Sequence, residues 1–381
     1  MLLVPTSRSK IAFISTEDWF FASHFLPMIE AVRQVGAEPV VITRVRNHRA
    51  VIEAAGARVI PFEADRSSLN PGKLTQSIYR LARLLRSEKI DAVHCIALRS
   101  ILIGAPAAAF AGIDRRVFAV TGGGFLGARK DLAGKFANAV LQMPIKAFQG
   151  PKTHYLFEND DDPAQFGLRA DAANVTIIGG AGVDPEHYFP EPLLTGNRLE
   201  VALVARMLWS KGVDLAVEAT GIARQAGHDV KLTLFGEPDP ANPRAISREV
   251  LEEWAQRDGI EWQGFVRDVR KVWSAHHVAC LPSRGGEGLP RTLLEAAACG
   301  RAMITTDVPG CRHFVRHGVD GLVVSPNDAK ALAYAMIKMA SDRGAVARMG
   351  QSARGRIFQG YRSEDIIKSV SELYTRLLTP A

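Results

Sequence analysis

The sequence predicts an α/β protein in which two doubly wound domains face a central cleft. Short apolar strands alternate with helix-length segments along the chain, a pattern typical of parallel sheets covered by helices on both faces. The alternation runs in two series, and a polar, proline-containing stretch at 183–198 separates them as a linker. A length of 381 residues also suits two domains.

The first series begins at an apolar strand close to the N-terminus. Strands are expected at 10–15, 39–44, 57–62, 91–97 and 115–120, and helices at 24–36, 49–56, 71–89 and 100–112. Glycine follows several of these helices, because it adopts the left-handed conformation that ends a helix without steric cost. We expect residues 1–185 to form the N-terminal domain.

The second series starts near residue 199 and repeats the alternation. Strands are expected at 198–206, 230–236, 260–265, 278–283 and 302–307, and helices at 212–227, 247–259, 269–276, 290–300 and 327–342. Residues 199–360 are therefore expected to form a C-terminal domain. The last segment, 361–378, is expected to cross back and pack on the first domain as a helix.

Charge is distributed unevenly along the chain. Residues 1–157 hold 21 Lys and Arg against 11 Asp and Glu, whereas the other 224 residues hold 26 against 29. A basic N-terminal half favours an anionic partner, such as phospholipid, a lipid diphosphate or nucleic acid; the alternative is a merely soluble basic surface. The four cysteines form no CxxC pair, so we expect reduced thiols in a cytoplasmic protein and no zinc site. No apolar stretch reaches the roughly 18 residues that span a bilayer.

A glycine-rich stretch, RGGEGLPRTLLEAAACG at 284–300, follows the expected strand 278–283. Pro290 suits the first helical position and Gly300 the helix end, so backbone N–H groups near the helix start are expected to favour a phosphate. Glu295, about one and a half turns into the helix, can accept hydrogen bonds from a ribose diol, and Glu287 can reach the hydroxyls of a sugar beyond the phosphates. The alternative is a loop glutamate and a surface helix glutamate without a ligand.

Two cations lie in the stretch VALVARMLWSKGVD at 201–214. Arg206 ends a strand and Lys211 precedes the next helix, so both are expected near the carboxyl end of a parallel strand, where such sheets bind ligands. Fixed cations there can neutralise a diphosphate leaving group as its charge develops. Taken alone, the two residues are equally compatible with solvated surface cations.

Together these stretches resemble glycosyltransferase family 4, which is retaining, metal-independent and has the GT-B fold of two Rossmann-like domains. The resemblance is strongest from 199 to 340, and includes CLPSRGGEGLPRTLLEAAACGRAMITTDVPGCRHFVRHGVDGLVV at 280–324. It implies that Arg206 and Lys211 bind the donor diphosphate, Glu295 the ribose, and Glu287 the donor sugar. Arg206, Lys211 and Glu287 are thus the implied catalytic residues. The remaining implied donor-binding positions are Gly264, Val266 and Arg267, which follow a strand and hold the base, and Gly288, Leu289, Pro290, Arg291 and Thr292 at the helix start.

The N-terminal half resembles a narrower bacterial subgroup that extends undecaprenyl-diphosphate-linked oligosaccharides. The similar stretches are 15–36, TGGGF at 121–125 and YLFENDDDPAQF at 155–166. N-acetylhexosamines are frequent donor sugars in that subgroup. Many members of the broad family have a glycine pair in the first loop, where this chain has TEDWFF, and a sugar-contacting histidine where this chain has Thr121–Gly124.

The aromatic residues of the first loop adjoin acidic residues and a histidine. They serve either as core packing or as a shelf for a sugar face or lipid, with a nearby side chain binding an acceptor hydroxyl. The acceptor-binding candidates are Asp18, Trp19 and His24, with Gly123 and Gly124 in a glycine loop that permits close approach. Two motifs are interpreted as structural: His94, and the acidic run 160–162, which Pro163 marks as a helix start.

Two basic, apolar segments favour attachment to anionic lipid, namely 71–89 and 127–148. A solvated helix face is the alternative, and no recognised motif accompanies the charge to favour nucleic acid. We therefore expect a cytoplasmic enzyme, peripheral on the inner face of the cytoplasmic membrane. It is expected to move a hexose or N-acetylhexosamine from a nucleotide diphosphate sugar, UDP first among them, to a lipid-linked saccharide, without a cofactor or metal. A sugar-nucleotide epimerase or phosphorylase, and an inactive binding subunit of a membrane complex, stay open.

Overall fold

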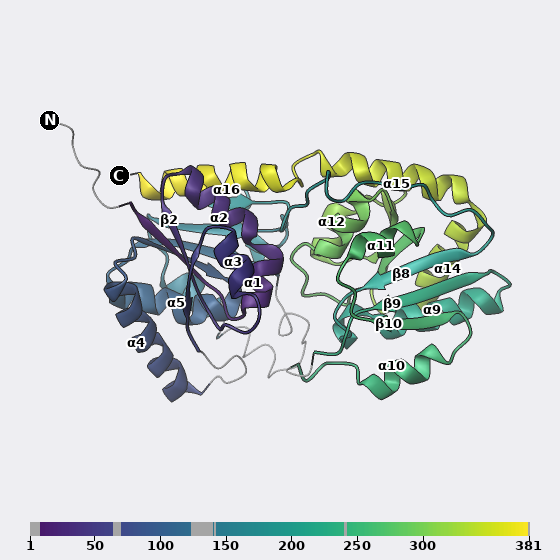
Figure 1. The fold of residues 1–381 in the computed structure, drawn as a ribbon, viewed down its shortest axis with the longest axis horizontal. Coiled ribbons are helices and arrows are strands. Elements are labelled where there is room, and N and C mark those ends of the chain that lie inside the picture. The colour runs from purple at the N-terminus through teal and green to yellow at the C-terminus, as the bar shows by residue number, and fades with distance from the viewer. Residues whose placement is uncertain (1–7, 64–69, 123–139, 141, 240–241, 380–381) are drawn as a thin grey trace. The chain divides into compact units, whose positions relative to one another are not determined.

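A computed structural model describes residues 8–63, 70–122, 140, 142–239 and 242–379 of the chain (Figure 1). It divides into two compact units: unit 1 comprises Met1–Gly182 and Ser363–Ala381, and unit 2 comprises Val183–Arg362. The chain therefore passes between the units twice.

Unit 1 is built on a seven-stranded parallel sheet with the order β3-β2-β1-β4-β5-β6-β7. Its strands are β1 (Lys10–Ile14), β2 (Glu38–Thr43), β3 (Arg58–Pro61), β4 (Ala92–Ile96), β5 (Arg115–Val120), β6 (Thr153–Phe157) and β7 (Val175–Ile177). Successive residues of β1 point to opposite faces, because side chains alternate along a strand. Ala12 and Ile14 join one hydrophobic cluster, and Ile11 and Phe13 join the other.

Helices cover both faces of this sheet. They are α1 (Asp18–His24), α2 (Leu26–Gln34), α3 (Arg49–Ala54), α4 (Pro71–Ser87), α5 (Ala97–Ala111), α8 (Asp162–Gln165) and α16 (Ser363–Leu378). One face carries α4 packed on α5, and the other carries α2 beside α16 (Figure 1). The C-terminal helix α16 thus buries Val370 and Leu373 against unit 1.

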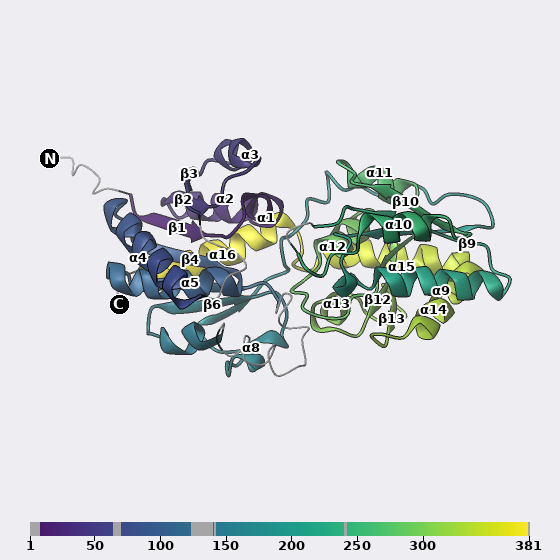
Figure 2. The same cartoon turned by 90° about the horizontal axis from the view of Figure 1, so that it is seen from below.

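Unit 2 contains a six-stranded parallel sheet with the order β10-β9-β8-β11-β12-β13. Its strands are β8 (Leu199–Val204), β9 (Val230–Phe235), β10 (Ile260–Gly264), β11 (Val278–Leu281), β12 (Ala302–Thr306) and β13 (Gly321–Val324). Its helices are the 3-10 turn η1 (Trp209–Lys211), α9 (Val213–Gln225), α10 (Arg248–Ala255), α11 (Val269–Ser274), α12 (Arg291–Ala298), α13 (Pro309–Phe314), α14 (Ala329–Ser341) and α15 (Arg343–Ile357). Helix α9 packs on α14, and α12 packs on α15 (Figure 2).

The predicted fold class, α/β with two doubly wound parallel sheets, is confirmed. In each unit the sheet grows outward from its first strand, reverses, and continues on the other side, so both have a switch point: β1/β4 in unit 1 and β8/β11 in unit 2. Ligands of such sheets bind outside the carboxyl ends of the strands at this point.

The stretch 183–198 differs from the predicted linker, because its first half packs on unit 2. Tyr188 is 9% exposed and belongs to a hydrophobic cluster with residues of α12. The guanidinium of Arg354 on α15 donates hydrogen bonds to the carbonyl oxygens of Pro185 (3.0 Å) and Tyr188 (2.7 Å). These bonds satisfy backbone acceptors that no strand or helix pairs, which is how irregular backbone becomes buried.

Candidate functional site

The predicted donor-binding residues lie along the carboxyl edge of the unit 2 sheet. Arg206 and Lys211 follow β8, Glu287 lies between β11 and α12, and Glu295 lies within α12. Because β8 and β11 are neighbours, these residues gather around the switch point.

Lys211 and Glu287 form an ion pair across the switch point. The Nζ atom of Lys211 lies 2.7 Å and 2.8 Å from the two carboxylate oxygens of Glu287, and the Ser283 hydroxyl donates to Oε1 at 2.7 Å. The side chains of Lys211 and Glu287 are 18% and 12% exposed, so the pair is sheltered but accessible. The sequence pattern assigned these two residues to one ligand without predicting that they would contact each other.

A close backbone approach brings the two loops of this ion pair together. Gly212 has a φ of +69°, and a Cβ atom there would lie 2.0 Å from the carbonyl oxygen of Pro282. Only glycine fits this position, since any side chain would push the loop after β8 away from the loop after β11. The amide of Arg284 adds a hydrogen bond to the carbonyl of Ser210 at 2.8 Å.

Arg206 forms an ion pair with a residue of the loop that follows β9. Its Nη1 atom lies 2.8 Å from Oδ2 of Asp239, and the two side chains are 43% and 14% exposed. The backbone amides of Met207 and Trp209 also bond to this loop, at the carbonyls of Glu237 and Arg244. Asp239 was missed from the sequence, although its place just after a parallel strand marks it as a candidate.

Helix α12 presents its N-terminus to the same edge. It begins at Arg291 and not at Pro290, whose ψ of 119° makes it the N-cap residue and corrects the predicted first helical position. Pro290 itself makes no side-chain hydrogen bond to the helix start. The Thr292 hydroxyl is buried and makes no hydrogen bond within the described part of the chain. Backbone amides and the helix dipole at such a start favour an anion.

Glu295 is almost buried, at 7% exposed, and is held by two side chains. Its Oε1 accepts hydrogen bonds from the Tyr188 hydroxyl (3.0 Å) and from Nε of Arg291 (2.7 Å). Burial and the negative charge of Glu295 raise the pKa of Tyr188 to about 12, so this hydroxyl stays a donor. Arg291, predicted to contact the donor, here pairs with Glu295, and Tyr188 was missed because it lies far away in sequence.

The predicted base-binding turn lies at the end of the edge strand β10. Gly264 has a φ of +70°, and its carbonyl accepts a hydrogen bond from the Gly236 amide at 2.7 Å. Phe265 is 71% exposed, Val266 packs partly on the hydrophobic cluster around α12, and Arg267 is exposed. Gly288 and Leu289 join α12 to the Glu287 loop, with the Leu289 side chain buried at 4% exposed.

The predicted acceptor loop of unit 1 is helical. Residues 18–24 form α1, a helix that was not predicted, and the helix predicted at 24–36 is α2, which starts at Leu26. Asp18 is fully buried, and its Oδ2 accepts hydrogen bonds from the amides of Arg46 (2.7 Å) and His48 (2.9 Å). Burial acts to raise the pKa of Asp18, but these amides outweigh it and lower the pKa. Asp18 therefore anchors the loop after β2, with no exposed surface of its own.

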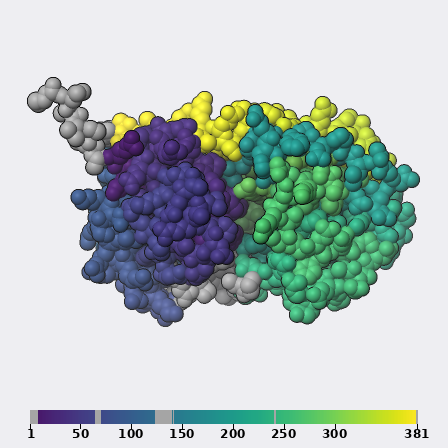
Figure 3. Space-filling model, viewed as in Figure 1, coloured from purple at the N-terminus to yellow at the C-terminus, as the bar shows by residue number. Residues whose placement is uncertain are grey.

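The aromatic residues of α1 divide between core and surface. Phe21 is buried in the hydrophobic cluster beneath α2, whereas Trp19, Phe20 and His24 are half-buried. The Phe20 and His24 rings are 4.9 Å apart, and Nδ1 of His24 lies 2.6 Å from the Ser23 hydroxyl. The N-terminal segments, in purple, form much of the visible face of unit 1 in Figure 3, with blue segments beside them. Gly123 and Gly124 lie outside the described residues.

Two sequence motifs occupy structural positions, as predicted. Asp162, at 4% exposed, is hydrogen-bonded by the side-chain amides of Asn159 and Gln165 (both 2.9 Å). His94 lies within β4, fully buried, with its Nδ1 2.7 Å from the Tyr374 hydroxyl of α16. Burial lowers the pKa of His94 to about 3. In the part of the chain that the structure covers, no cluster of His, Cys, Asp or Glu is arranged to hold a metal ion.

Comparison with known proteins assigns this architecture to a class. The fold matches the Anabaena protein Alr3699/HepE in complex with UDP-glucose, with a TM-score of 0.78, 17% identity, and coverage of 96% of this chain and 99% of that one. It also matches sucrose-phosphate synthase of Thermosynechococcus elongatus, with a TM-score of 0.78, 20% identity, and coverage of 97% and 99%. Two doubly wound sheets of this kind are the GT-B fold of glycosyltransferases.

Sequence comparison then gives the family. Residues 10–147 match the family "Glycosyl transferase 4-like", and residues 198–342 match "Glycosyl transferases group 1". The two matches together cover most of the chain, which therefore belongs to these glycosyltransferases.

Two curated relatives extend over most of the chain. An N,N'-diacetylbacillosaminyl-diphospho-undecaprenol alpha-1,3-N-acetylgalactosaminyltransferase of Campylobacter jejuni is 26% identical, over 93% of this chain and 96% of its own. A UDP-Gal:alpha-D-GlcNAc-diphosphoundecaprenol alpha-1,3-galactosyltransferase of Escherichia coli is 24% identical, over 78% and 79%.

Proposed function

We propose that this glycosyltransferase is retaining and moves a hexose or N-acetylhexosamine from a UDP-sugar to a saccharide carried on a lipid diphosphate. The two relatives named above act on undecaprenol-linked acceptors, and one uses UDP-galactose, as their names state. In the proposed reaction unit 2 binds the donor and unit 1 supplies the acceptor-binding residues Trp19 and His24.

The Lys211–Glu287 ion pair is the observation that carries this proposal. It joins a cation and a carboxylate at the switch point, beside the N-terminus of α12. An incoming diphosphate competes for Lys211 and thereby frees the oxygens of Glu287 for sugar hydroxyls. Arg206 and the first amides of α12 add positive charge for the same diphosphate.

In the proposed mechanism the departing diphosphate acts as the base. The bond between the sugar C1 atom and the β-phosphate oxygen breaks through an oxocarbenium-like state while the acceptor oxygen bonds to C1 on the same face. The acceptor proton passes to the leaving phosphate oxygen, so no enzymic nucleophile is needed. Lys211 and Arg206 stabilise the negative charge that develops on that oxygen. No metal takes part in this scheme.

A donor screen tests the proposal. UDP-, GDP- and ADP-sugars are compared for their effect on the thermal unfolding midpoint, and the best donor is then incubated with a synthetic lipid-diphosphate saccharide. We expect a UDP-sugar to stabilise the protein and the product to keep the donor's anomeric configuration, as proton NMR of the new linkage reports. Inverted product contradicts the mechanism, and turnover of the nucleotide sugar to an epimer or sugar phosphate without acceptor contradicts the reaction class.

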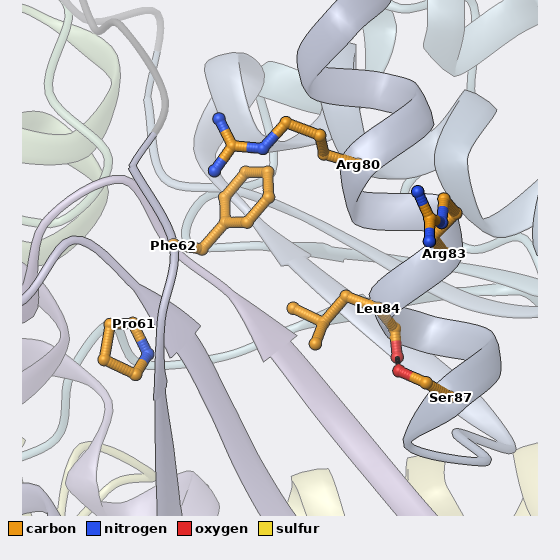
Figure 4. A pocket seen from close by; sticks show the side chains of 6 residues that line it. All are labelled: Pro61, Phe62, Arg80, Arg83, Leu84 and Ser87. Carbon is orange, nitrogen blue, oxygen red and sulfur yellow. Dashed lines mark hydrogen bonds between the residues drawn. The ribbon is translucent and has the colours of Figure 1, made fainter.

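We further propose that the exposed face of α4 attaches the enzyme to anionic lipid. Within the described residues no helix has the length and apolarity needed to cross a bilayer. The exposed cations of α4 and the turn after it are Lys73, Arg80, Arg83, Arg86 and Lys89. A hollow beside α4 combines two of them, Arg80 and Arg83, with apolar surface, because the Arg80 guanidinium lies over the Phe62 ring at 5.5 Å and Leu84 also lines the hollow (Figure 4). Basic groups around an apolar surface suit a phospholipid headgroup region.

Vesicle flotation tests this attachment. The protein is expected to float with vesicles containing phosphatidylglycerol but not with phosphatidylcholine alone. Replacing Arg80, Arg83 and Arg86 by glutamine should abolish flotation, because each basic residue near an anionic surface contributes about 1 kcal/mol. The same replacement of the exposed unit 2 residues Arg257, Lys330 and Arg348 is the matched control. Equal loss in both triple variants indicates a net-charge effect and contradicts the α4 assignment.

A further inference from the structure

Arg284 joins three loops at the carboxyl edge of the unit 2 sheet. Its Nη1 and Nη2 atoms pair with the two carboxylate oxygens of Asp214 at the start of α9, at 2.7 Å and 2.8 Å. Nη1 also donates to the Trp209 carbonyl, and Nε donates to Oδ1 of Asn327 at 2.8 Å. One side chain therefore connects the loops that follow β8, β11 and β13.

The loops that Arg284 connects are those of the ion pair. Lys211 lies between the Trp209 carbonyl and Asp214, the two contact points of Arg284 on the loop after β8. On the other side, Arg284 directly follows Ser283, whose fully buried hydroxyl donates to Glu287 (2.7 Å) and to the Ser210 carbonyl (3.3 Å). The separation between the Lys211 and Glu287 side chains is thus set by contacts on both flanks.

We propose that Arg284 is a positioning residue for transfer: it holds the loops of Lys211 and Glu287 at the separation that receives the donor diphosphate and sugar. The proposal rests on the function proposed above. Bidentate arginine–carboxylate pairs have a fixed planar geometry and are among the stronger charged hydrogen bonds. Their contribution grows with shelter from solvent, and the Arg284 and Asp214 side chains are only 25% and 28% exposed.

Arg224 provides a matched control in the same unit. It lies at the end of α9, and its side chain is also 25% exposed. It pairs with Asp258 (2.9 Å from Nε) and Asp229 (3.1 Å from Nη1), and donates to the Val230 carbonyl at 3.0 Å. These contacts lie at the amino end of β9, the opposite edge of the sheet from the ion pair.

Two measurements on Arg284→Gln and Arg224→Gln test the proposal. The first is amide hydrogen exchange of the intact protein without ligand. Arg284→Gln is expected to raise exchange in 208–212 and 283–288, and Arg224→Gln only near its own contacts. The second is steady-state transfer: Arg284→Gln should lower kcat/KM for the donor on the order of 100-fold, because small misplacements of reacting groups have effects of this size. Arg284→Lys keeps the positive charge but not the planar guanidinium. Its kcat/KM should therefore lie between those of the wild type and Arg284→Gln.

The outcomes separate this inference from the proposed function. Unchanged exchange in both loops of Arg284→Gln overturns the positioning role, whatever the enzyme's substrate. Equal losses of kcat/KM in Arg284→Gln and Arg224→Gln, at equal losses of thermal stability, also overturn it. A wild-type protein that turns over no nucleotide sugar contradicts the proposed function alone, because the exchange data still decide what Arg284 holds.

Discussion

The acidic residues at the two switch points differ in burial and in the partners of their carboxylates. After β1 in unit 1, Asp18 is fully buried, and two backbone amides of the loop after β2 donate hydrogen bonds to its carboxylate. After β11 in unit 2, Glu287 keeps 12% of its side chain exposed, and a lysine side chain neutralises it. Both residues lie at a switch point, Asp18 after the first strand of its sheet and Glu287 after the strand that pairs with the first strand on its other side.

This difference shows that a carboxylate at a switch point can either stabilise the fold or remain accessible to a ligand. Backbone amides cannot leave Asp18 without opening the loop, so that carboxylate belongs to the fold. A lysine side chain can rotate to another anion, so in the proposed donor site the carboxylate of Glu287 exchanges its partner when the diphosphate binds. Parallel-sheet topology predicts where ligands bind, but the partner of each charge decides whether a residue holds the fold or the ligand.

The largest expected effect comes from replacing Lys211, the cation that pairs with Glu287. Lys211→Ala should lower kcat for transfer on the order of 100- to 1,000-fold, because a cation that stabilises developing charge in a sheltered site contributes at that level. The thermal unfolding midpoint should hardly change. Lys231→Ala is the matched control, since Lys231 pairs with Glu261 at 2.6 Å on β9 and β10, away from the site. Near-normal turnover by Lys211→Ala contradicts the proposed donor site.

A second test replaces Asp18, the buried carboxylate of unit 1. Asp18→Ala should lower the free energy of unfolding by about 1–3 kcal/mol, because it leaves the partly buried backbone amides of Arg46 and His48 without their acceptor. Donor affinity, measured by calorimetry with the best UDP-sugar, should stay at the wild-type value. Chemical denaturation gives the stability. A variant of wild-type stability that loses only transfer would assign Asp18 to the acceptor instead.

A smaller effect distinguishes two buried tyrosine hydroxyls. Tyr188→Phe removes a hydrogen bond to Glu295, and should raise the donor KM about 3- to 10-fold, as loss of one such bond implies. Tyr374→Phe removes the bond to His94 in unit 1, and should lower stability without changing the donor KM. Steady-state kinetics and thermal unfolding of both variants make the comparison. Equal KM changes in the two variants would mean that Tyr188 has no specific link to the donor.

The smallest expected effect is a pH dependence of stability. Because burial lowers the pKa of His94 to about 3, the unfolded chain binds a proton at His94 as pH falls below about 6.5, while the folded chain does not. The stability is therefore complete at neutral pH and should decline by about 1 kcal/mol between pH 7 and pH 5.5. Denaturant unfolding of His94→Gln at both pH values should show a smaller decline. An identical decline in the variant would mean that His94 is not responsible.

The periodicity of the sequence was sufficient to predict the fold class and most strands, because parallel strands buried on both faces are nearly continuous apolar runs. It missed the strands β6, β7 and β13. The pattern also placed Arg206, Lys211, Glu287 and Glu295 near one edge, since each lies after a strand or at the following helix.

What the sequence could not predict was the partner of each charge. The pairing of Lys211 with Glu287 joins residues that are distant along the chain, and so does that of Tyr188 with Glu295. The burial of Asp18 depends on the course of the loop after β2, which no local pattern specifies. Tertiary contacts of this kind decide which polar residues stay accessible.

The hydrogen bond between Tyr188 and Glu295 has a consequence for communication within the enzyme. Tyr188 lies on the segment by which the chain enters unit 2, and the Arg354 guanidinium donates hydrogen bonds to two carbonyl groups of that segment. In the proposed donor site the nucleotide binds a Glu295 carboxylate that Tyr188 holds in place, so donor binding is coupled to the position of the segment that enters unit 2. By thermodynamic reciprocity, if nucleotide binding shifts the position of this segment, then a change that shifts the segment also changes the affinity for the nucleotide.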